Sequence, residues 1–334
     1  MSTQRHRYSV PPSGCYVPAV TFYTPDAVQS LDLAAQKKYF RYLSTTGLRG
    51  IVVLGSNAET LLLTREERIA LVETARAAVP KDYPLIAGIM GHSTAQVIEY
   101  AADAAEAGAD YFLLLPCAYF GKQTTPAVIK SFFADIAPHL PRPTLIYNFP
   151  AVTNGVDLDS DIIADIARAN DIYVGVKLTC GSVAKIARLA GTFPPERFAV
   201  FGGQSDFLVG GLAVGSSGCI AAFANIFPKS VARLYDLYAS GRHAEARRLQ
   251  HALALAEAPT KAGIANTKYA AAVYTAGPWA GVERAEEGAR PRHPYKEPGK
   301  EEKEKIRRVM EPYRWLEDGK GKGKSEEYVE RAQL

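Results

Sequence analysis

A lysine stands near the end of an apolar stretch, YVGVKLTCG, at residues 173–181. Four of the first six residues are apolar, and a turn of small residues follows Lys177. Removal from water disfavours an ammonium, and the neutral amine that results is a nucleophile that forms a Schiff base with a ketone. Lys177 is therefore a candidate nucleophile. The same pattern also fits a lysine whose stem is buried while its ammonium reaches solvent, or a lysine in a buried ion pair.

Two other groups have chemistry that would serve such a lysine. Tyr147 comes near the end of PTLIYN at 143–148, and a phenol beside the amine can move the protons that carbinolamine formation and C–C cleavage require. Ser56 and Asn57 follow GIVVLG at 50–55, and the hydroxyl, amide and backbone N–H groups of such a turn suit a carboxylate. Tyrosine, serine and asparagine are also ordinary residues at strand ends and turns.

These candidates need strands whose ends meet at one place. Eight short runs are rich in Val, Ile, Leu, Tyr or Phe and bounded by Gly, Pro or Asp, a pattern typical of strands buried on both faces. The runs are 15–22, 50–55, 84–89, 110–116, 143–148, 172–178, 198–203 and 218–223. Helix-like segments separate them; one begins with the capping box Thr64 and Glu67, and another begins at Ser93 and ends at Gly108.

Strands that alternate with helices predict a parallel sheet with right-handed crossovers, and eight such units close most naturally into an α/β fold of the (β/α)8 TIM-barrel type. A doubly wound open sheet is the alternative, but no GxGxxG motif opens a helix after a strand. We predict the barrel over 14–227, extra helices over 228–281, and a charged, flexible tail over 282–334 with a short helix near 300–317. The active site of such a barrel lies at the C-terminal strand ends.

Bulk composition narrows the class of protein. The 334 residues include 39 basic and 35 acidic side chains, for a net charge of +4, a balance that does not indicate a nucleic-acid partner. No apolar run approaches the roughly 20 residues of a membrane span, and the N-terminal residues lack the apolar region of a signal peptide. The four cysteines are widely spaced, as in a reduced intracellular protein. We expect a cytoplasmic location, with a mitochondrial one left open.

Five motifs together resemble a known family, the pyruvate-dependent class I aldolases of the dihydrodipicolinate synthase and N-acetylneuraminate lyase superfamily. The motifs are GSNAE at 55–59, YNFP at 147–150, GVKLTCG at 175–181, GGQSD at 202–206 and SGCIAAFANIFP at 217–228. The resemblance covers roughly residues 14–275. It implies a (β/α)8 barrel with extra C-terminal helices, a homo-oligomer that is a tetramer or a dimer, and catalysis with no metal and no organic cofactor.

The resemblance also implies roles for particular residues. The family's Schiff-base lysine falls on Lys177, its proton-relay tyrosine on Tyr147, and its substrate-carboxylate turn on Ser56 and Asn57. A second relay tyrosine, often lent to a neighbouring subunit in the family, has Tyr119 as its candidate here, at a shifted spacing.

The same resemblance gives expectations about the substrate, a small 2-keto acid that is split into pyruvate and an aldehyde. Dihydrodipicolinate synthases carry an arginine where this chain has Val152, which disfavours their condensation reaction. YNFP, GVDLDSD and VGVKLTCG look most like fungal L-threo-3-deoxy-hexulosonate aldolases, whose products are pyruvate and L-glyceraldehyde. The GSN turn is also similar to that of 4-hydroxy-2-oxoglutarate aldolases, and this alternative stays open. Thr179, Gly202 and Ile220 are expected to line the substrate site.

A non-catalytic barrel that binds sugar acids is the last alternative. The presence of both Lys177 and Tyr147 argues against it.

Overall fold

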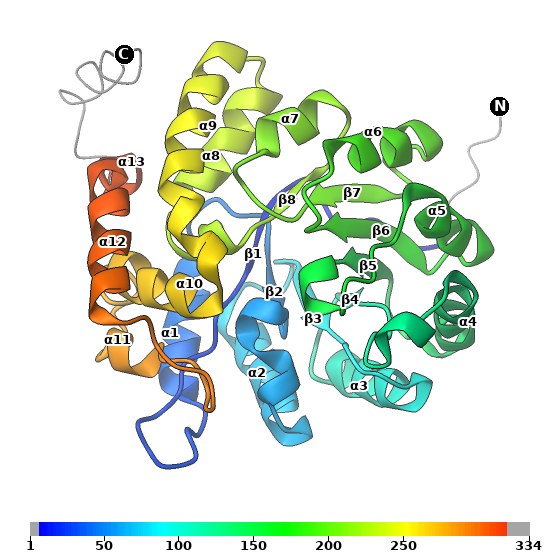
Figure 1. The fold of residues 1–334 in the computed structure, drawn as a ribbon, viewed down its shortest axis with the longest axis horizontal. Coiled ribbons are helices and arrows are strands. Elements are labelled where there is room, and N and C mark those ends of the chain that lie inside the picture. The colour runs from blue at the N-terminus through cyan, green and yellow to red at the C-terminus, as the bar shows by residue number, and fades with distance from the viewer. Residues whose placement is uncertain (1–6, 319–334) are drawn as a thin grey trace.

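The computed structural model describes residues 7–318, and within them eight parallel strands form a closed barrel (Figure 1). Each strand pairs with its sequence neighbours, and β1 closes the barrel against β8. The strands are β1 Gly14–Pro18, β2 Gly50–Val53, β3 Leu85–Gly88, β4 Tyr111–Leu114, β5 Thr144–Asn148, β6 Tyr173–Leu178, β7 Ala199–Gly202 and β8 Gly218–Ile220. Each of them overlaps one of the eight predicted apolar runs, and only β1 begins one residue outside its run, so the predicted TIM barrel is confirmed.

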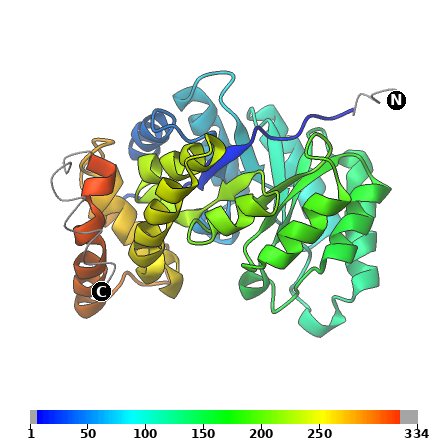
Figure 2. The same cartoon turned by 90° about the horizontal axis from the view of Figure 1, so that it is seen from above.

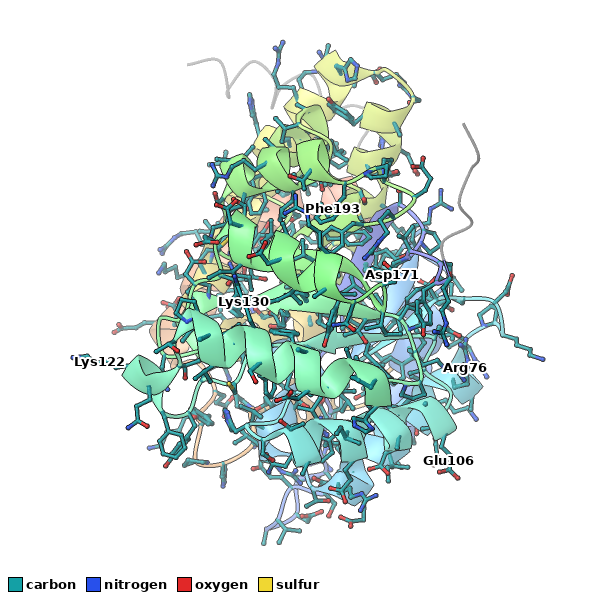
Figure 3. All side chains as sticks on the ribbon, turned by 90° about the vertical axis from the view of Figure 1, so that its right-hand side faces the viewer. Arg76, Glu106, Lys122, Lys130, Asp171 and Phe193 are labelled. Carbon is teal, nitrogen blue, oxygen red and sulfur yellow. The ribbon has the colours of Figure 1, made fainter. Side chains whose placement is uncertain are left out.

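Helices follow the strands and form the outer layer. They are α1 Leu33–Leu43, α2 Arg65–Ala78, α3 Thr94–Glu106, α4 Pro126–Ile136, α5 Ser160–Ala169, α6 Val183–Thr192, α7 Leu208–Ala213 and α8 Pro228–Ala239. The predicted capping box of α2 is present, since the Thr64 side chain accepts from the Glu67 N–H and the Glu67 carboxylate accepts from the Thr64 N–H. Figure 3 shows α3 to α6 side by side, with Glu106 and Lys122 at opposite ends of this layer.

The barrel wall separates two apolar regions. Side chains on the outer face of the strands pack against the helices and form the larger cluster. The inner cluster fills the barrel and includes Leu145, Tyr147, Phe201 and Ile220. Alternate residues of a strand point to opposite faces, so the inner cluster shows which positions of each strand face the interior.

The C-terminal segment differs from the solvated tail that its composition predicts. Up to residue 318, five α-helices follow the barrel strands and α8: α9 His243–Glu257, α10 Ile264–Ala271, α11 Ala285–Gly288, α12 Lys300–Met310 and α13 Trp315–Asp318. Ile306 and Met310 of α12 are fully buried, and the carboxylate of Glu317 accepts from the N–H groups of Lys229 and Ser230.

The segment therefore packs against the rest of the protein up to residue 318. Its few apolar residues recur on one face of α12, and this spacing outweighs the high overall charge. Figures 1 and 2 show α10 to α13 gathered on the side of the barrel opposite α4 and α5. The GKGKGK run lies outside the described residues. Within residues 7–318, no helix combines the length and the apolar character that crossing a bilayer requires.

Candidate active site

A one-residue bulge in β6 determines which way Lys177 points. Thr144 of β5 pairs with Tyr173, but the next residue, Leu145, pairs with Gly175, so Val174 is an extra residue in β6. Beyond the bulge, Lys177 pairs with Tyr147, which faces the barrel interior. Tyr173 faces the helices, and strict alternation from it would send Lys177 to the helices as well. The bulge thus turns Lys177 inward.

The amine of Lys177 lies in an apolar and nearly sealed position. The residue is 3% exposed. Its two strand partners, Tyr147 on β5 and Phe201 on β7, both belong to the inner apolar cluster. Its Nζ atom lies 3.2 Å from the hydroxyl oxygen of Tyr147 and 4.3 Å from the centre of that ring. The structure therefore excludes the alternative of a lysine whose ammonium reaches solvent.

A chain of polar groups leads from the amine to the turn after β2. Lys177 donates to the Tyr147 oxygen, which leaves the phenol proton free to point elsewhere. The Ser56 hydroxyl is 3.4 Å from the same oxygen. Ser56 begins the short 3-10 helix η1, Ser56–Ala58, so the predicted carboxylate-binding turn lies beside the predicted nucleophile and its proton relay.

Comparison with other buried lysines shows what is unusual about Lys177. Lys185 pairs with Asp157, and Lys268 pairs with Glu59. Within the described part of the chain, no carboxylate lies within the 4.0 Å of an ion pair from Lys177. The alternative of a buried ion pair at Lys177 is thereby removed. Among the described residues, the Lys177 amine hydrogen-bonds to one side chain, a phenol and not a carboxylate, and such an amine is suited to nucleophilic chemistry.

The remaining strand-end candidates have different positions. The Thr179 hydroxyl is buried and has no hydrogen-bond partner among the described residues, so it is available to a ligand. Ile220 ends β8 and lies in the inner cluster. Gly202 ends β7, but a side chain there would point at the ring of Phe207, so only its backbone is available to a substrate. Asn57 is partly buried within η1.

Tyr119 does not join this group. It is 70% exposed, and its ring packs against His92 and Phe120. The Asn154 amide donates to its backbone carbonyl at 3.3 Å. Within residues 7–318 no contact links Tyr119 to Tyr147 or Lys177, and its relay role stays a prediction.

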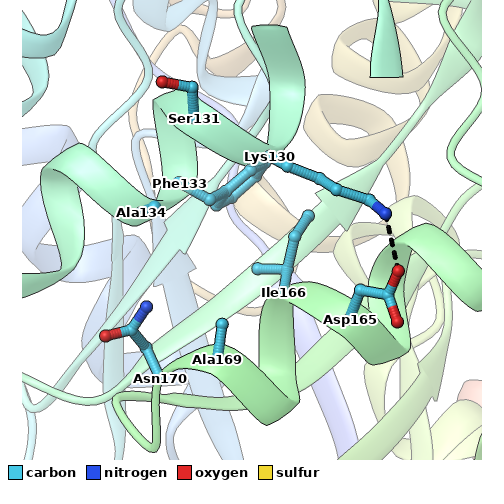
Figure 4. Close-up of a pocket in the computed structure, with 8 residues that line it drawn as sticks. All are labelled: Lys130, Ser131, Phe133, Ala134, Asp165, Ile166, Ala169 and Asn170. Atoms are coloured by element: carbon cyan, nitrogen blue, oxygen red, sulfur yellow. Dashed lines mark hydrogen bonds and ion pairs between the residues drawn. The ribbon is translucent and has the colours of Figure 1, made fainter. Parts of the chain in front are cut away.

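A groove of about 370 Å³ lies elsewhere, on the outer layer between α4 and α5 (Figure 4). Phe133 and Ile166 line it, and the Lys130–Asp165 ion pair, at 2.6 Å, crosses one end. None of the predicted site residues lines this groove. In the described residues no three His, Cys, Asp or Glu side chains gather in a way that would hold a metal ion.

Comparison with known proteins gives the family. The model of the dihydrodipicolinate synthetase family matches residues 12–312. The chain belongs to this family. A Coccidioides immitis protein, provisionally named a mitochondrial 4-hydroxy-2-oxoglutarate aldolase, is 57% identical over 93% of this chain and 98% of its own length. The L-threo-3-deoxy-hexylosonate aldolase of Hypocrea jecorina is 37% identical over 79% of this chain and 87% of its own.

A solved structure agrees with this assignment. A dihydrodipicolinate synthase family protein from Coccidioides immitis superposes with a TM-score of 0.87 at 55% identity, over 93% of this chain and 98% of its own. The family and the named relatives make this chain a class I aldolase, a carbon–carbon lyase.

Two features that position the site of this aldolase were not found from the sequence. Gly175 lies at the bulge, and a Cβ there would stand 2.5 Å from the carbonyl oxygen of Ala199 on β7. Arg197 donates to the carbonyl oxygens of Tyr173 and Ala167 at 2.7 and 2.6 Å, so the backbone at the start of the bulge is tied to a buried guanidinium. Of these two features, only Gly175, two residues before Lys177, gave a signal in the sequence.

A second network fixes the end of β5. The Asn148 amide donates to Asp157 at 2.7 Å, and its oxygen accepts from the Leu158 N–H at 2.9 Å. Lys185 binds the same Asp157 carboxylate. The pKa of Asp157 is lowered, since the bonds from Lys185 and Asn148 outweigh the opposing effect of burial. This network holds the residues that follow Tyr147.

Proposed function

We propose that this aldolase cleaves a 4-hydroxy-2-oxo acid to pyruvate and an aldehyde through a Schiff base on Lys177. The observation that carries the proposal is the buried amine of Lys177, which has no carboxylate partner in the described residues and lies 3.2 Å from the Tyr147 hydroxyl. Ser56 and Asn57 would hold the carboxylate of the 2-oxo acid, next to the carbonyl that the amine attacks.

The proposed steps balance without a cofactor. The amine adds to C2 of the substrate, and Tyr147 gives its proton to the C2 hydroxyl, which leaves as water to give a protonated imine. The resulting Tyr147 phenolate takes the proton of the C4 hydroxyl while the C3–C4 bond breaks, the aldehyde departs, and the electron pair forms an enamine. Protonation of C3 and hydrolysis of the imine release pyruvate and restore Lys177. In this proposal Tyr147 moves the protons in both halves of the cycle, which its 3.2 Å contact with the Lys177 amine supports.

Two substrates are favoured by different observations. The 57% identity to the protein provisionally named a 4-hydroxy-2-oxoglutarate aldolase favours that acid, whose aldehyde product is glyoxylate. The H. jecorina relative, together with the motifs that resemble it, favours a 3-deoxy-hexulosonate. We place 4-hydroxy-2-oxoglutarate first, because the likeness is closer and covers more of the chain. This order reverses the one that the sequence motifs suggested.

Val152 bears on the condensation reaction that the motifs disfavour. It is 43% exposed at the end of the 3-10 helix Pro150–Val152, and an apolar side chain gives no bidentate donor to a carboxylate. We therefore expect aspartate semialdehyde to be a poor acceptor for the pyruvate enamine. The same argument counts against glyoxylate, whose carboxylate would need donors other than residue 152.

The first experiment tests the Schiff base. The wild-type protein is incubated with pyruvate and borohydride, and its mass is measured. We expect the mass of one reduced pyruvyl group on a peptide that contains Lys177. The Lys177→Ala and Lys177→Arg variants should give no adduct, because a guanidinium stays protonated. The matched control is Lys130→Arg, which changes an exposed lysine of the outer layer that pairs with Asp165. An adduct on Lys177→Ala would place the nucleophile elsewhere.

The second experiment separates the substrates. Condensation of pyruvate with glyoxylate, L-glyceraldehyde and aspartate semialdehyde is compared by kcat/KM at equal pyruvate. Glyoxylate should be the best acceptor if 4-hydroxy-2-oxoglutarate is the substrate, and L-glyceraldehyde the best if the sugar acid is. A clear preference for aspartate semialdehyde would contradict both.

Location and assembly remain proposals. The mitochondrial name of the C. immitis relative favours mitochondria over the cytoplasm, and a C-terminal fluorescent fusion would distinguish the two compartments. The homo-oligomer implied by the family resemblance is testable by light scattering of the purified protein.

A further inference from the structure

The residue after the predicted carboxylate-binding turn is a buried glutamate. Glu59 follows Ser56–Ala58 in the left-handed conformation, at φ 57°, and its N–H donates to the Ser56 carbonyl oxygen at 3.0 Å. Its side chain is 4% exposed. A buried carboxylate is stable only where charges and hydrogen bonds compensate the loss of water, so the partners of Glu59 help to determine where the turn lies.

Both carboxylate oxygens of Glu59 are bound by the C-terminal part of the chain. The Lys268 Nζ atom of α10 lies 2.5 Å from one oxygen, and the backbone N–H of Arg292 donates to the other at 2.8 Å. Lys268 is fully buried and also donates to the carbonyl oxygen of Arg290. Residues more than 200 positions along the chain therefore hold the carboxylate beside Ser56.

The side chain of Arg292 holds its backbone in place for the contact with Glu59. Its guanidinium pairs with Glu67 of α2 at 2.5 Å and donates to the carbonyl oxygens of Leu62 and Gln29 at 2.9 and 3.0 Å. Leu62 belongs to the 3-10 helix η2, Thr60–Leu62, directly after Glu59. The guanidinium thus bridges α2, η2 and the loop after β1, and it fixes the backbone N–H that reaches Glu59.

From these contacts we infer that Lys268 and Arg292 are positioning residues for the Ser56–Asn57 turn, and that they act through Glu59. The C-terminal segment from 264 to 293 then sets the affinity for the 2-oxo acid's carboxylate, although it contributes no group to the bond-breaking steps. The inference rests on the proposed function, in which this turn binds that carboxylate. Loss of either residue should weaken substrate binding and leave the chemistry at Lys177 unchanged.

The test measures imine trapping at a series of pyruvate concentrations. The concentration that gives half-maximal trapping reports binding, and the limiting rate at saturation reports the reactivity of Lys177. Arg292→Ala should raise the half-saturating concentration roughly tenfold, which corresponds to about 1.4 kcal/mol, with a limiting rate within about twofold of wild type. Arg290→Ala is the matched control, because within residues 7–318 the one ion pair of its exposed side chain is with Glu297. It should change neither quantity.

A second pair of variants tests the buried carboxylate itself. Lys268→Met removes the cation and leaves Glu59 buried without it, so the half-saturating concentration should rise. Glu59→Gln in the Lys268→Met background removes the uncompensated charge. The half-saturating concentration should then return toward the wild-type value. If the variants lose thermal stability but keep the wild-type half-saturating concentration, the inference is overturned. Glu59, Lys268 and Arg292 would then contribute to stability alone. A wild-type protein that traps no pyruvate would instead overturn the proposed function.

Discussion

Gly175→Ala offers a direct test of how the bulge in β6 aims the nucleophile. The added Cβ would stand 2.5 Å from the Ala199 carbonyl oxygen, which is roughly 1–1.5 Å closer than ordinary van der Waals separation. Backbone carbonyls of a barrel cannot turn aside as a flexible side chain can. We therefore expect β6 to move from β7 by that amount, and Lys177, two residues further on, to move with it.

The size of the effect follows from that displacement. A misplacement near 1 Å can cost about 10²-fold in rate, which is roughly 2.7 kcal/mol of activation free energy. Packing an extra carbon into a full core should also lower the free energy of unfolding by about 1–3 kcal/mol. The assay is steady-state pyruvate release, with the limiting rate of borohydride trapping measured on the same samples.

Gly191→Ala is the matched control. Gly191 lies in α6, and a Cβ there has no atom within 4 Å. This change should leave kcat unaltered and stabilise the protein by up to about 1 kcal/mol, because alanine favours a helix more than glycine does. If Gly175→Ala lowers the melting temperature but keeps kcat within a factor of about two of wild type, the reasoning about the bulge is refuted.

Two further predictions concern the phenol and a buried lysine. Tyr147→Phe keeps the ring beneath the amine and should retain the borohydride adduct while turnover falls by about 10² to 10⁴, the usual contribution of acid–base catalysis; near-normal turnover would remove Tyr147 from the mechanism. Burial lowers the pKa of Lys268 from 10.5 to about 8, against the opposing effect of Glu59. Between these two values the unfolded chain binds more protons, so the free energy of unfolding should rise with pH from about 8 to 10. Lys268→Met should lack this rise in urea titrations, and a wild-type curve without it would contradict the assignment.

Much of the fold could be predicted because local patterns specify it. Runs of apolar residues bounded by glycine or proline specify strands covered on both faces, and caps such as Thr64 and Ser93 specify where helices begin. Eight such units leave few topologies, since crossovers between parallel strands are right-handed. The residue types at the strand ends then located Lys177, Tyr147 and Ser56.

Other features depend on contacts that no local pattern carries. Residues 282–318 look solvated by composition, yet a few apolar residues on one face of α12 are enough to pack that face against the rest of the protein. Tyr119 was a candidate by residue type, but its exposure is set by how the loop after β4 packs, which composition does not specify.

The sequence by itself determined the chemical types at the site, their order along the barrel, and the family. Only the tertiary structure decided which way these side chains point and which residues hold them in place. Alternation along β6 gives the wrong face for Lys177 unless the extra residue Val174 is recognised, and that residue is visible only from the pairing with β5. The compensation of Glu59 by Lys268 joins positions 209 residues apart. Such a pairing follows from how the completed barrel brings α10 against the turn after β2, because the chain can satisfy a buried charge with any partner that the fold places beside it.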